Sequence, residues 1–299
     1  MHLAEGVLPP THALACAAAA APFVWAGARQ IKSVGTHRVA MTTALLFAVT
    51  LFPVPVPIAG MSSHMCAAPV LALLLGASAL VVPTTLVLII QALFFAHGGL
   101  STLGANVLTL GVAGPCAAVG IARVLRALRA PVPAAVFAAC FGADLVVYGV
   151  DGLLLAAALA EPGAFVSMTR SLLLAMAPAQ LPLALLEGAL SVALVKALTQ
   201  REGARLPVWL RPSAPRLGPT AVAGLVLALV ATPPLPARAS SFAGLDEQVF
   251  ETAARQAGRT PQPLLDLEGG ELGRALFGSA MLAAGFVLGR GWRRLERRS

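Results

Sequence analysis

Histidine is the residue type in this chain that is best suited to bind a metal ion. The chain has five histidines, separated by long apolar stretches: His2, His12, His37, His64 and His97. Imidazole nitrogen binds zinc, copper, iron and nickel, and by similar chemistry cobalt. His37 lies among basic residues and is expected simply to face water. The other four histidines are therefore candidates for a metal site.

The second residue of the chain gives the strongest indication of a metal site. A bulky residue at position 2 normally blocks removal of the initiator methionine, so Met1 is expected to persist. The Met1 amine, the His2 amide nitrogen and the His2 imidazole can then bind one ion through two adjacent chelate rings. An all-nitrogen site of this kind prefers square-planar geometry, which favours Ni²⁺, Cu²⁺ or low-spin Co²⁺. A fourth nitrogen is needed, and either His64 or His97 can supply it.

Two loops of unusual sequence carry these candidate partners. His64 lies in residues 61–66 (MSSHMC), just after the proline-rich residues 53–57, which force extended backbone and predict a shaped re-entrant loop. Met65 and Cys66 offer soft sulfur ligands, although packing is the interpretation we favour for both. Residues 97–106 are glycine-rich and permit close backbone approach. No phosphate-binding GxxxxGK[ST] motif occurs in the chain, so we expect no ATPase activity of its own.

A third group of polar residues falls inside apolar stretches. Asp144 and Asp151 are seven residues apart with Tyr148 between them, so they share one helix face. Gln180 and Glu187 repeat this spacing in the next apolar stretch. Acids within a membrane are costly and are functional candidates by default. The sequence leaves two roles open for them, which are static hydrogen bonding between helices and a proton relay.

The composition indicates which elements must position these residues. The chain is 58% hydrophobic and 11% charged, whereas a soluble domain has about 25% charged residues. This excludes a soluble globular protein and a disordered chain, and predicts an all-α polytopic membrane protein. About nine transmembrane helices are expected, with the third and fourth separated around Pro83. Their expected ranges are 12–31, 39–56, 66–81, 83–96, 104–127, 132–160, 171–198, 218–234 and 273–290.

The net charge of +8 follows from the distribution of basic residues along the chain. If the N-terminus lies outside, most of the 21 lysines and arginines fall on inner segments. The positive-inside rule therefore predicts an external N-terminus and a cytoplasmic C-terminus. This orientation places His2, His12, His64 and His97 on or near the outer face. It also explains the basic charge without a nucleic-acid partner.

Several short motifs, in this order, resemble the CbiM/NikM family of substrate-binding membrane subunits. These subunits belong to the energy-coupling-factor (ECF) importers of cobalt and nickel. The motifs are residues 1–10 (MHLAEGVLPP), 53–60 followed by Ser63-His64, 91–95 (QALFF) with 97–100 (HGGL), 103–106 (LGAN), Asp144-Leu145 with Tyr148, and 180–183 (QLPL) with Glu187-Gly188.

The resemblance implies a particular set of metal ligands. These are the Met1 amine, the amide and imidazole of His2, and His64. His97 would lie close by as an accessory ligand or a supporting group. Glu5, Ser62 and Ser63 are expected to orient the ligating imidazoles.

The resemblance also implies a domain organisation. Residues 1–200 would form a seven-helix metal-binding domain, and 201–217 would form a cytoplasmic linker. Residues 218–299, with two helices and an external loop at 235–272, are similar to the small accessory subunit of such importers (CbiN/NikN or PDGLE-like). Within that loop, residues 246–256 have helical apolar spacing.

The expected function is that of a transporter subunit in the inner (cytoplasmic) membrane, not an enzyme. In this family the subunit captures Co²⁺ or Ni²⁺ from outside and passes it inward. It works with a transmembrane coupling subunit and two cytoplasmic ATP-binding subunits. The alternative is a stand-alone proton-coupled divalent metal permease that uses Asp144, Asp151 and Glu187. Both ions accept the same four-nitrogen plane, so the sequence leaves the choice between cobalt and nickel open.

Overall fold

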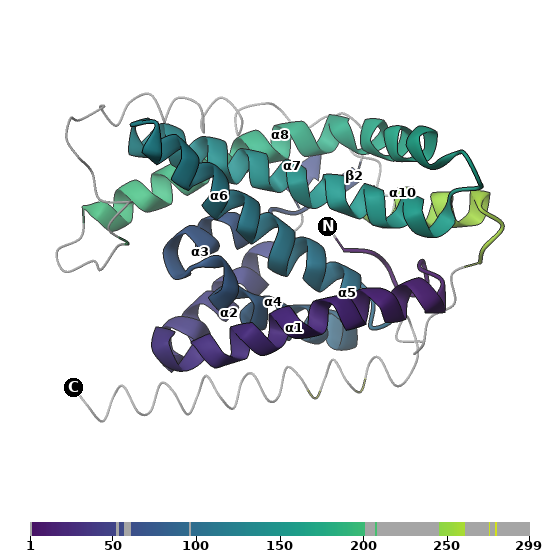
Figure 1. The fold of residues 1–299 in the computed structure, drawn as a ribbon, viewed down its shortest axis with the longest axis horizontal. Coiled ribbons are helices and arrows are strands. Elements are labelled where there is room, and N and C mark those ends of the chain that lie inside the picture. The colour runs from purple at the N-terminus through teal and green to yellow at the C-terminus, as the bar shows by residue number, and fades with distance from the viewer. Residues whose placement is uncertain are drawn as a thin grey trace.

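Helices make up almost all of the described part of this computed structural model (Figure 1). The structure describes residues 2–51, 54–56, 61–95, 97–200, 207, 245–260, 275 and 279. Its elements are α1 Pro10–Val34, α2 Thr36–Leu51, β1 Val54–Val56, β2 Met61–Ser63, α3 Ala68–Leu75, α4 Ala77–Phe95, α5 Leu103–Asn106, η1 Val107–Ala113, α6 Gly114–Ala127, α7 Val132–Leu159, α8 Phe165–Thr199 and α10 Leu245–Gln256. The predicted spans at 218–234 and 273–290 lie outside the described residues, apart from 275 and 279.

Five of the described segments are long and apolar enough to cross a membrane: Pro10–Ile31, Ala77–Phe95, Leu103–Ala127, Val132–Leu159 and Phe165–Thr199. His37–Leu51 is a shorter apolar helix. Large apolar side chains on these segments face outward, and Trp25, Val166 and Leu174 are 59%, 75% and 60% exposed. Such surfaces are unfavourable in water and match a lipid environment. The structure therefore supports a helical multi-pass membrane protein, while the count of nine spans stays a prediction.

The third and fourth spans were predicted to be separated around Pro83, and this prediction was wrong. The helix break lies at Gly76, where φ is +97°, a conformation that favours glycine. Pro83 lies inside α4 instead of at its start. The hydroxyls of Thr84 and Thr85 donate hydrogen bonds to the carbonyls of Leu80 and Val81. Hydroxyl groups of this kind help a membrane helix to accommodate a proline.

The predicted second span, 39–56, was too long at its C-terminal end. α2 ends at Leu51, and residues 54–56 instead form β1. β1 pairs antiparallel with β2, with Val54 opposite Ser63. This short hairpin is the only β-structure among the described residues. It confirms that the segment before His64 is extended rather than helical.

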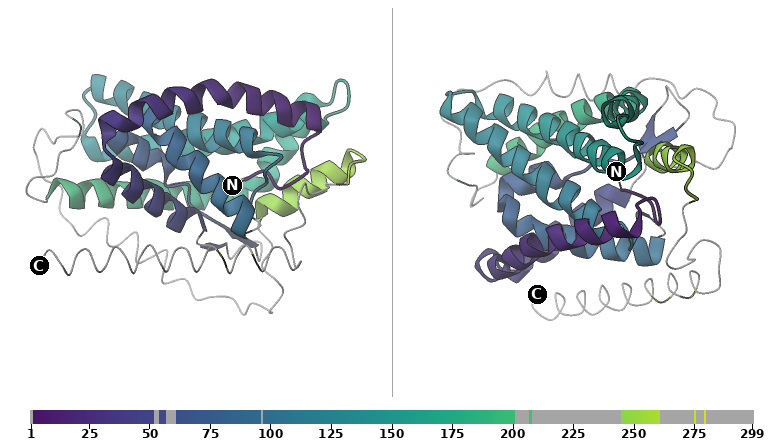
Figure 2. Two further views of the ribbon diagram at one scale, coloured as in Figure 1. Left: turned by 90° about the horizontal axis from the view of Figure 1, so that it is seen from below. Right: turned by 45° about the vertical axis from the view of Figure 1, so that its right-hand side comes forward.

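The helices form two packed groups on either side of the N-terminal segment (Figure 1, Figure 2). In one group α7 and α8 lie side by side and α6 packs on α7. In the other, α1 and α2 pack on α4, and α4 also contacts η1. α10 lies at one end of the molecule, against α8, α7 and β2.

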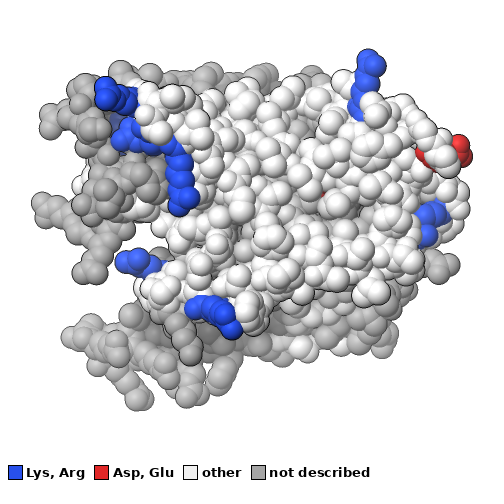
Figure 3. Space-filling view, in the orientation of Figure 1, with Lys and Arg blue, Asp and Glu red and all other residues white. Residues whose placement is uncertain are grey.

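Charged side chains gather at the two ends of the molecule (Figure 3). Most of the blue lysine and arginine atoms in this view lie at the end where α6 stops and α7 starts. Fewer lie at the opposite end, together with the acidic atoms that stand out most. The surface between the ends is almost free of charge. An uncharged belt between two polar ends is typical of a protein that spans a bilayer.

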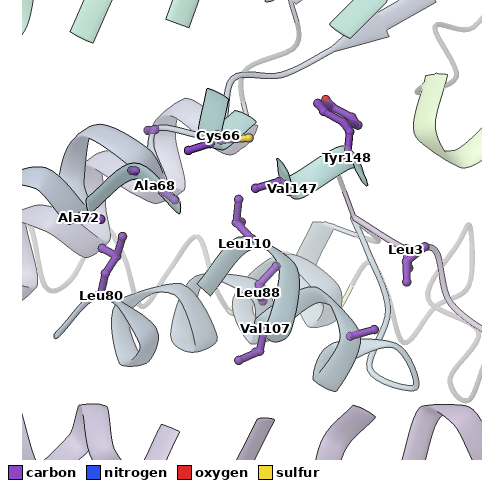
Figure 4. Close-up of a cluster of buried hydrophobic side chains, with 14 of the residues drawn as sticks. Leu3, Cys66, Ala68, Ala72, Leu80, Leu88, Val107, Leu110, Val147 and Tyr148 are labelled. Atoms are coloured by element: carbon purple, nitrogen blue, oxygen red, sulfur yellow. The ribbon is translucent and has the colours of Figure 1, made fainter. Parts of the chain in front are cut away.

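Buried apolar side chains from α4, η1 and α7 meet the N-terminal segment in one cluster (Figure 4). Leu88, Leu110 and Val147 are at most 2% exposed, and Leu3 is a fully buried member of the same cluster. Burying a leucine side chain contributes about 1.5–3 kcal/mol to stability. The N-terminal segment is therefore anchored in the core by its own apolar residues.

Gly104 in α5 allows close packing against α1, which gives a prediction about stability. A Cβ at Gly104 would lie 2.3 Å from the backbone nitrogen of Ala17. We expect Gly104→Ala to destabilise the protein by about 1–3 kcal/mol, because the two helices must move apart. Thermal unfolding in detergent measures this as a lower midpoint. Gly120→Ala in α6 is the control, since its Cβ would meet nothing within 4 Å. Equal midpoints for the two variants would contradict the prediction.

Candidate metal centre

The backbone of Leu3 is fixed by polar side chains at the start of the fifth predicted span. The Leu3 N–H donates to Asn106 Oδ1 at 2.7 Å, and Asn106 Nδ2 donates back to the Leu3 carbonyl at 3.1 Å. The Thr102 hydroxyl donates to the same carbonyl at 2.6 Å. All three residues are buried. Because Leu3 follows His2 directly, these bonds position the His2 backbone.

A second set of contacts holds the next turn of the N-terminal segment against the glycine-rich loop. The Gly6 N–H donates to Ser101 Oγ at 2.9 Å, and the Ser101 N–H donates to the Glu5 carboxylate at 3.2 Å. Gly98 has φ +79°, and a Cβ there would lie 3.1 Å from His2 Cβ. A Cβ at Gly99 would lie 2.6 Å from Glu5 Cα. The glycines therefore let this loop lie directly against His2 and Glu5.

The loop that carries His64 is bonded to the two longest helices. Ser63 Oγ lies 3.4 Å from the Tyr148 hydroxyl of α7. Gln180 Nε2 of α8 donates to the same Ser63 oxygen at 3.3 Å. Both bonds are buried. The residue next to His64 is therefore fixed from two sides.

Two acids from the same two helices, Asp144 and Glu187, bind this loop at Cys66, three residues after Ser63. The Cys66 N–H donates to Glu187 Oε2 at 2.7 Å, and the Cys66 thiol donates to Asp144 Oδ1 at 2.8 Å. Burial and these neighbouring acids raise the pKa of the Cys66 thiol, consistent with a thiol that donates. Asp151 is fully buried on the same face of α7. Four of the five predicted intramembrane polar residues thus contact the His64 loop through bonds described here.

Three of the predicted histidines meet in one group. The ring centroids of His2 and His64 are 5.0 Å apart, those of His2 and His97 are 4.5 Å apart, and those of His64 and His97 are 5.0 Å apart. One ring nitrogen from each lies within 4.8 Å of the others. An ion bound near the centre of such a triangle is within reach of all three imidazoles after small side-chain movements.

The hydrogen bonding of these rings indicates which nitrogens can bind a metal. Both ring nitrogens of His2 are buried, and neither has a hydrogen-bond partner among the residues that the structure describes. A buried nitrogen without a partner costs about 1–3 kcal/mol. His64 Nδ1 lies 3.1 Å from the Met65 carbonyl. A carbonyl only accepts, so Nδ1 carries the hydrogen and Nε2 carries the lone pair that can bind a metal.

Burial controls the charge of the histidines. It lowers the pKa of His2 and His64 well below the ordinary 6.5, and the charge of His97 lowers that of His2 further. Both rings are therefore neutral at neutral pH, which is the form that binds metal ions.

The remaining predicted residues lie at different distances from this group. The Met1 amine lies outside the described residues. Ser62 pairs with Pro55 in the hairpin. His12 lies on α1, where its ring is 3.4 Å from the Thr11 hydroxyl, and His37 is exposed on α2. Neither histidine belongs to the group of three.

Asn106, Thr102 and Ser101 are positioning residues that side-chain chemistry alone did not identify in the sequence. They are common polar types, and their contacts join residues about a hundred positions apart. The sequence pointed to residues 97–106 through their glycines, and to residues 103–106 through their family resemblance, but not to these three side chains. A π-helical segment, η1, directly follows Asn106, and such segments often occur at functional sites.

Long apolar helices around a buried histidine group define the class of a multi-pass membrane protein with a candidate metal centre. Comparison with known proteins narrows that class. The family described as "Cobalt uptake substrate-specific transmembrane region" (CbiM) matches residues 2–204. The chain belongs to the CbiM family, so the predicted resemblance is confirmed.

Individual relatives agree with this assignment. The cobalt transport protein CbiM of Geobacter sulfurreducens is 37% identical, over 100% of this chain and 91% of that protein. The CbiM of Sorangium cellulosum is 39% identical, over 67% of this chain and 92% of that protein. A crystal structure of a truncated transition metal transporter has a TM-score of 0.58 at 26% identity, over 66% of this chain and 98% of that one. The chain is therefore a membrane transport protein and not an enzyme, as predicted.

Proposed function

We propose that this chain captures Co²⁺ or Ni²⁺ at the outer face of the inner (cytoplasmic) membrane and passes it inward. The observation that carries the proposal is the buried group of His2, His64 and His97, with both His2 nitrogens unpaired among the described residues. Neutral, buried imidazoles suit a borderline divalent cation. The names of the relatives, which are cobalt transport proteins, favour cobalt.

The proposed ligands are the Met1 amine, the amide and Nδ1 of His2, and Nε2 of His64. Asn106 and Thr102 support them by fixing the residue after His2. Ser63 supports them by fixing the residue before His64. His97 is the accessory group, since its ring is as close to His2 as that of His64. Glu5 acts one step further away, through the Ser101 backbone.

The proposed topology has seven spans in residues 1–200 and two in residues 218–299, with the N-terminus outside. Two observations support it. The larger group of basic side chains lies at the end where α6 stops (Figure 3), which would be cytoplasmic. α10 belongs to the predicted external loop 235–272, and Arg259 just after it donates to the Gly6 and Leu8 carbonyls of the N-terminal segment. We infer that residues 218–299 act as an accessory region in contact with the metal-binding domain.

The proposed partners are a transmembrane coupling subunit and two cytoplasmic ATP-binding subunits. The absence of a phosphate-binding loop in the sequence supports external ATPases as the energy source. Cobalt uptake by cells that express the chain tests this. Uptake should require an ATPase partner. Uptake by this chain alone, abolished by an uncoupler, would instead support the proton-coupled permease with Asp144, Asp151 and Glu187.

Elemental analysis tests the identity of the ion. The purified full-length chain is exposed to equal concentrations of Co²⁺ and Ni²⁺ and then washed. We expect one of these two ions to be retained, with cobalt favoured. Retention of neither ion would contradict the proposal.

The depressed pKa of the histidines gives a prediction about pH. Burial keeps His2 and His64 neutral below the ordinary histidine pKa of 6.5. As pH falls, protons displace the metal only when the lowered pKa is approached. Acid release of Co²⁺ should therefore occur at lower pH from the protein than from the free tripeptide Met-His-Leu, which has the same terminal chelate. Metal retention measured against pH for both checks this, and release at equal or higher pH from the protein would refute it.

A further inference from the structure

Cys66, Asp144 and Glu187 form a second group of potential ligands that the proposed histidine centre does not use. One oxygen or sulfur atom from each lies within 4.8 Å of the others. Cys66 and Asp144 are fully buried, and Glu187 is 3% exposed. The three residues come from the loop before α3, from α7 and from α8, so packing of distant segments creates the group.

The hydrogen bonds within this group leave one carboxylate oxygen of Glu187 unsatisfied among the described residues. Its Oε2 accepts from the Cys66 N–H, but its Oε1 is buried with no hydrogen-bond partner in the described part of the chain. Two carboxylates this close in a dry interior cannot both carry charge without a positive partner. A proton supplies one such partner, and a divalent cation is the other that fits two carboxylates and a thiol.

The position of the group places it on a path inward from the histidines. Cys66 is two residues beyond His64, so their Cα atoms are at most about 7 Å apart. α7 and α8 pack side by side and are joined by the short connection 160–164, so they run in opposite directions. Asp144 lies one turn, about 6 Å, from Tyr148 toward the start of α7. Glu187 lies about 10 Å from Gln180 toward the end of α8.

Asp144 is displaced from Tyr148, and Glu187 from Gln180, in the same direction, which is away from the connection 160–164. Tyr148 and Gln180 hold Ser63 beside His64, so they mark the level of the histidine loop. With the proposed orientation, Asp144 and Glu187 are deeper and nearer to the cytoplasm. We propose that Cys66, Asp144 and Glu187 form a second binding site for the transported Co²⁺ or Ni²⁺ ion. This inference rests on the proposed function, because it assumes that the ion first binds at the histidines.

The chemistry of the two sites differs in a way that spectroscopy detects. The histidine centre offers nitrogen, whereas the second site offers one sulfur and two carboxylates. Binding there exchanges a proton on sulfur, and any proton held by a carboxylate, for the cation. A thiolate bound to Co²⁺ gives a charge-transfer band in the near ultraviolet, and an all-nitrogen site does not.

The experiment is a titration of the purified full-length chain with Co²⁺ until absorbance and bound metal both stop changing. We expect a first ion without the sulfur band and a second ion with it. Cys66→Ser should lose the band, keep the first ion, and weaken binding of the second by more than about 100-fold, because a ligand is lost and not only a group that supports one. Glu187→Gln should weaken the second ion similarly, because the amide oxygen still accepts the Cys66 N–H but carries no charge.

Matched variants test whether Cys66 is the sulfur ligand and whether the Cys66→Ser variant is folded. Cys116→Ser changes an exposed thiol, and Asp151→Asn changes a buried acid on the same helix face as Asp144, so both should keep the band. Retention of the first ion by Cys66→Ser shows that this variant is folded. If it does not fold, Glu187→Gln decides, and a band that develops at the same Co²⁺ concentration as in the wild type refutes the site. A saturated wild-type chain without the band, or a band that survives Cys66→Ser, also overturns it.

The histidine centre is tested separately in the same titration. His64→Ala should weaken the first ion and leave the sulfur band at high Co²⁺. Failure of the second site therefore removes only the band, whereas failure of the proposed function leaves the affinity of the first ion unchanged in His64→Ala.

Discussion

We expect His64→Ala to reduce the affinity of the full-length chain for Co²⁺ by more than about 100-fold. Loss of groups that only support a metal ligand typically costs 10–100-fold, and loss of a ligand costs more. His64 is 5% exposed, and its Nδ1 contact with the Met65 carbonyl leaves the lone pair on Nε2. The loop is held by Ser63 and Cys66, so it cannot shift to bring another of its own residues into the place of the imidazole. Equilibrium dialysis against Co²⁺ measures the change.

His37→Ala is the matched control, since it removes an exposed histidine outside the group. Its affinity should match the wild type within about threefold, which is less than 1 kcal/mol. A second variant with extra residues before Met1 removes the terminal amine and should lose binding to a similar extent. If His64→Ala and the extended chain both bind as tightly as the wild type, the proposed ligand set is wrong.

The sequence predicts the histidine centre because its signals are local. A histidine at position 2, a proline-rich loop before His64 and glycines after His97 each restrict backbone or chemistry within a few residues. The structure brings these three histidines together. It excludes His12 and His37 from the group, and the helical apolar spacing of residues 246–256 correctly predicted a helix, α10.

The polar network of the helices was only partly predictable, since partner choice depends on tertiary packing. Spacing pairs Asp144 with Asp151 along one helix. In the structure, Asp144 instead lies with Glu187 and Cys66, because α7 and α8 pack in opposite directions against the same loop. Cys66 is buried, as a packing residue would be, but its thiol also donates to a carboxylate. The helix break at Gly76 was missed because proline is the stronger local signal, although a membrane helix tolerates it.

The second large effect on cobalt affinity is expected at Asn106, which is not one of the proposed metal ligands. Its side chain accepts from the Leu3 N–H and donates to the Leu3 carbonyl, so one amide fixes both backbone groups of the residue after His2. Asn106→Leu keeps the volume and removes both bonds. The Leu3 N–H is then buried without an acceptor, which costs about 1–3 kcal/mol and favours displacement of the N-terminal segment. We expect cobalt affinity to fall about 10–100-fold.

Thr109→Val is the control that separates positioning from general destabilisation. Thr109 is equally buried in η1, but its hydroxyl donates only to the Asn106 carbonyl within the same helical segment. It should bind Co²⁺ within about threefold of the wild type, a difference under 1 kcal/mol. Hydrogen exchange at the Leu3 amide supplies the second measurement, because it should accelerate in Asn106→Leu and not in Thr109→Val. If both variants lose affinity equally while Leu3 stays protected, Asn106 stabilises the fold in general and does not position His2.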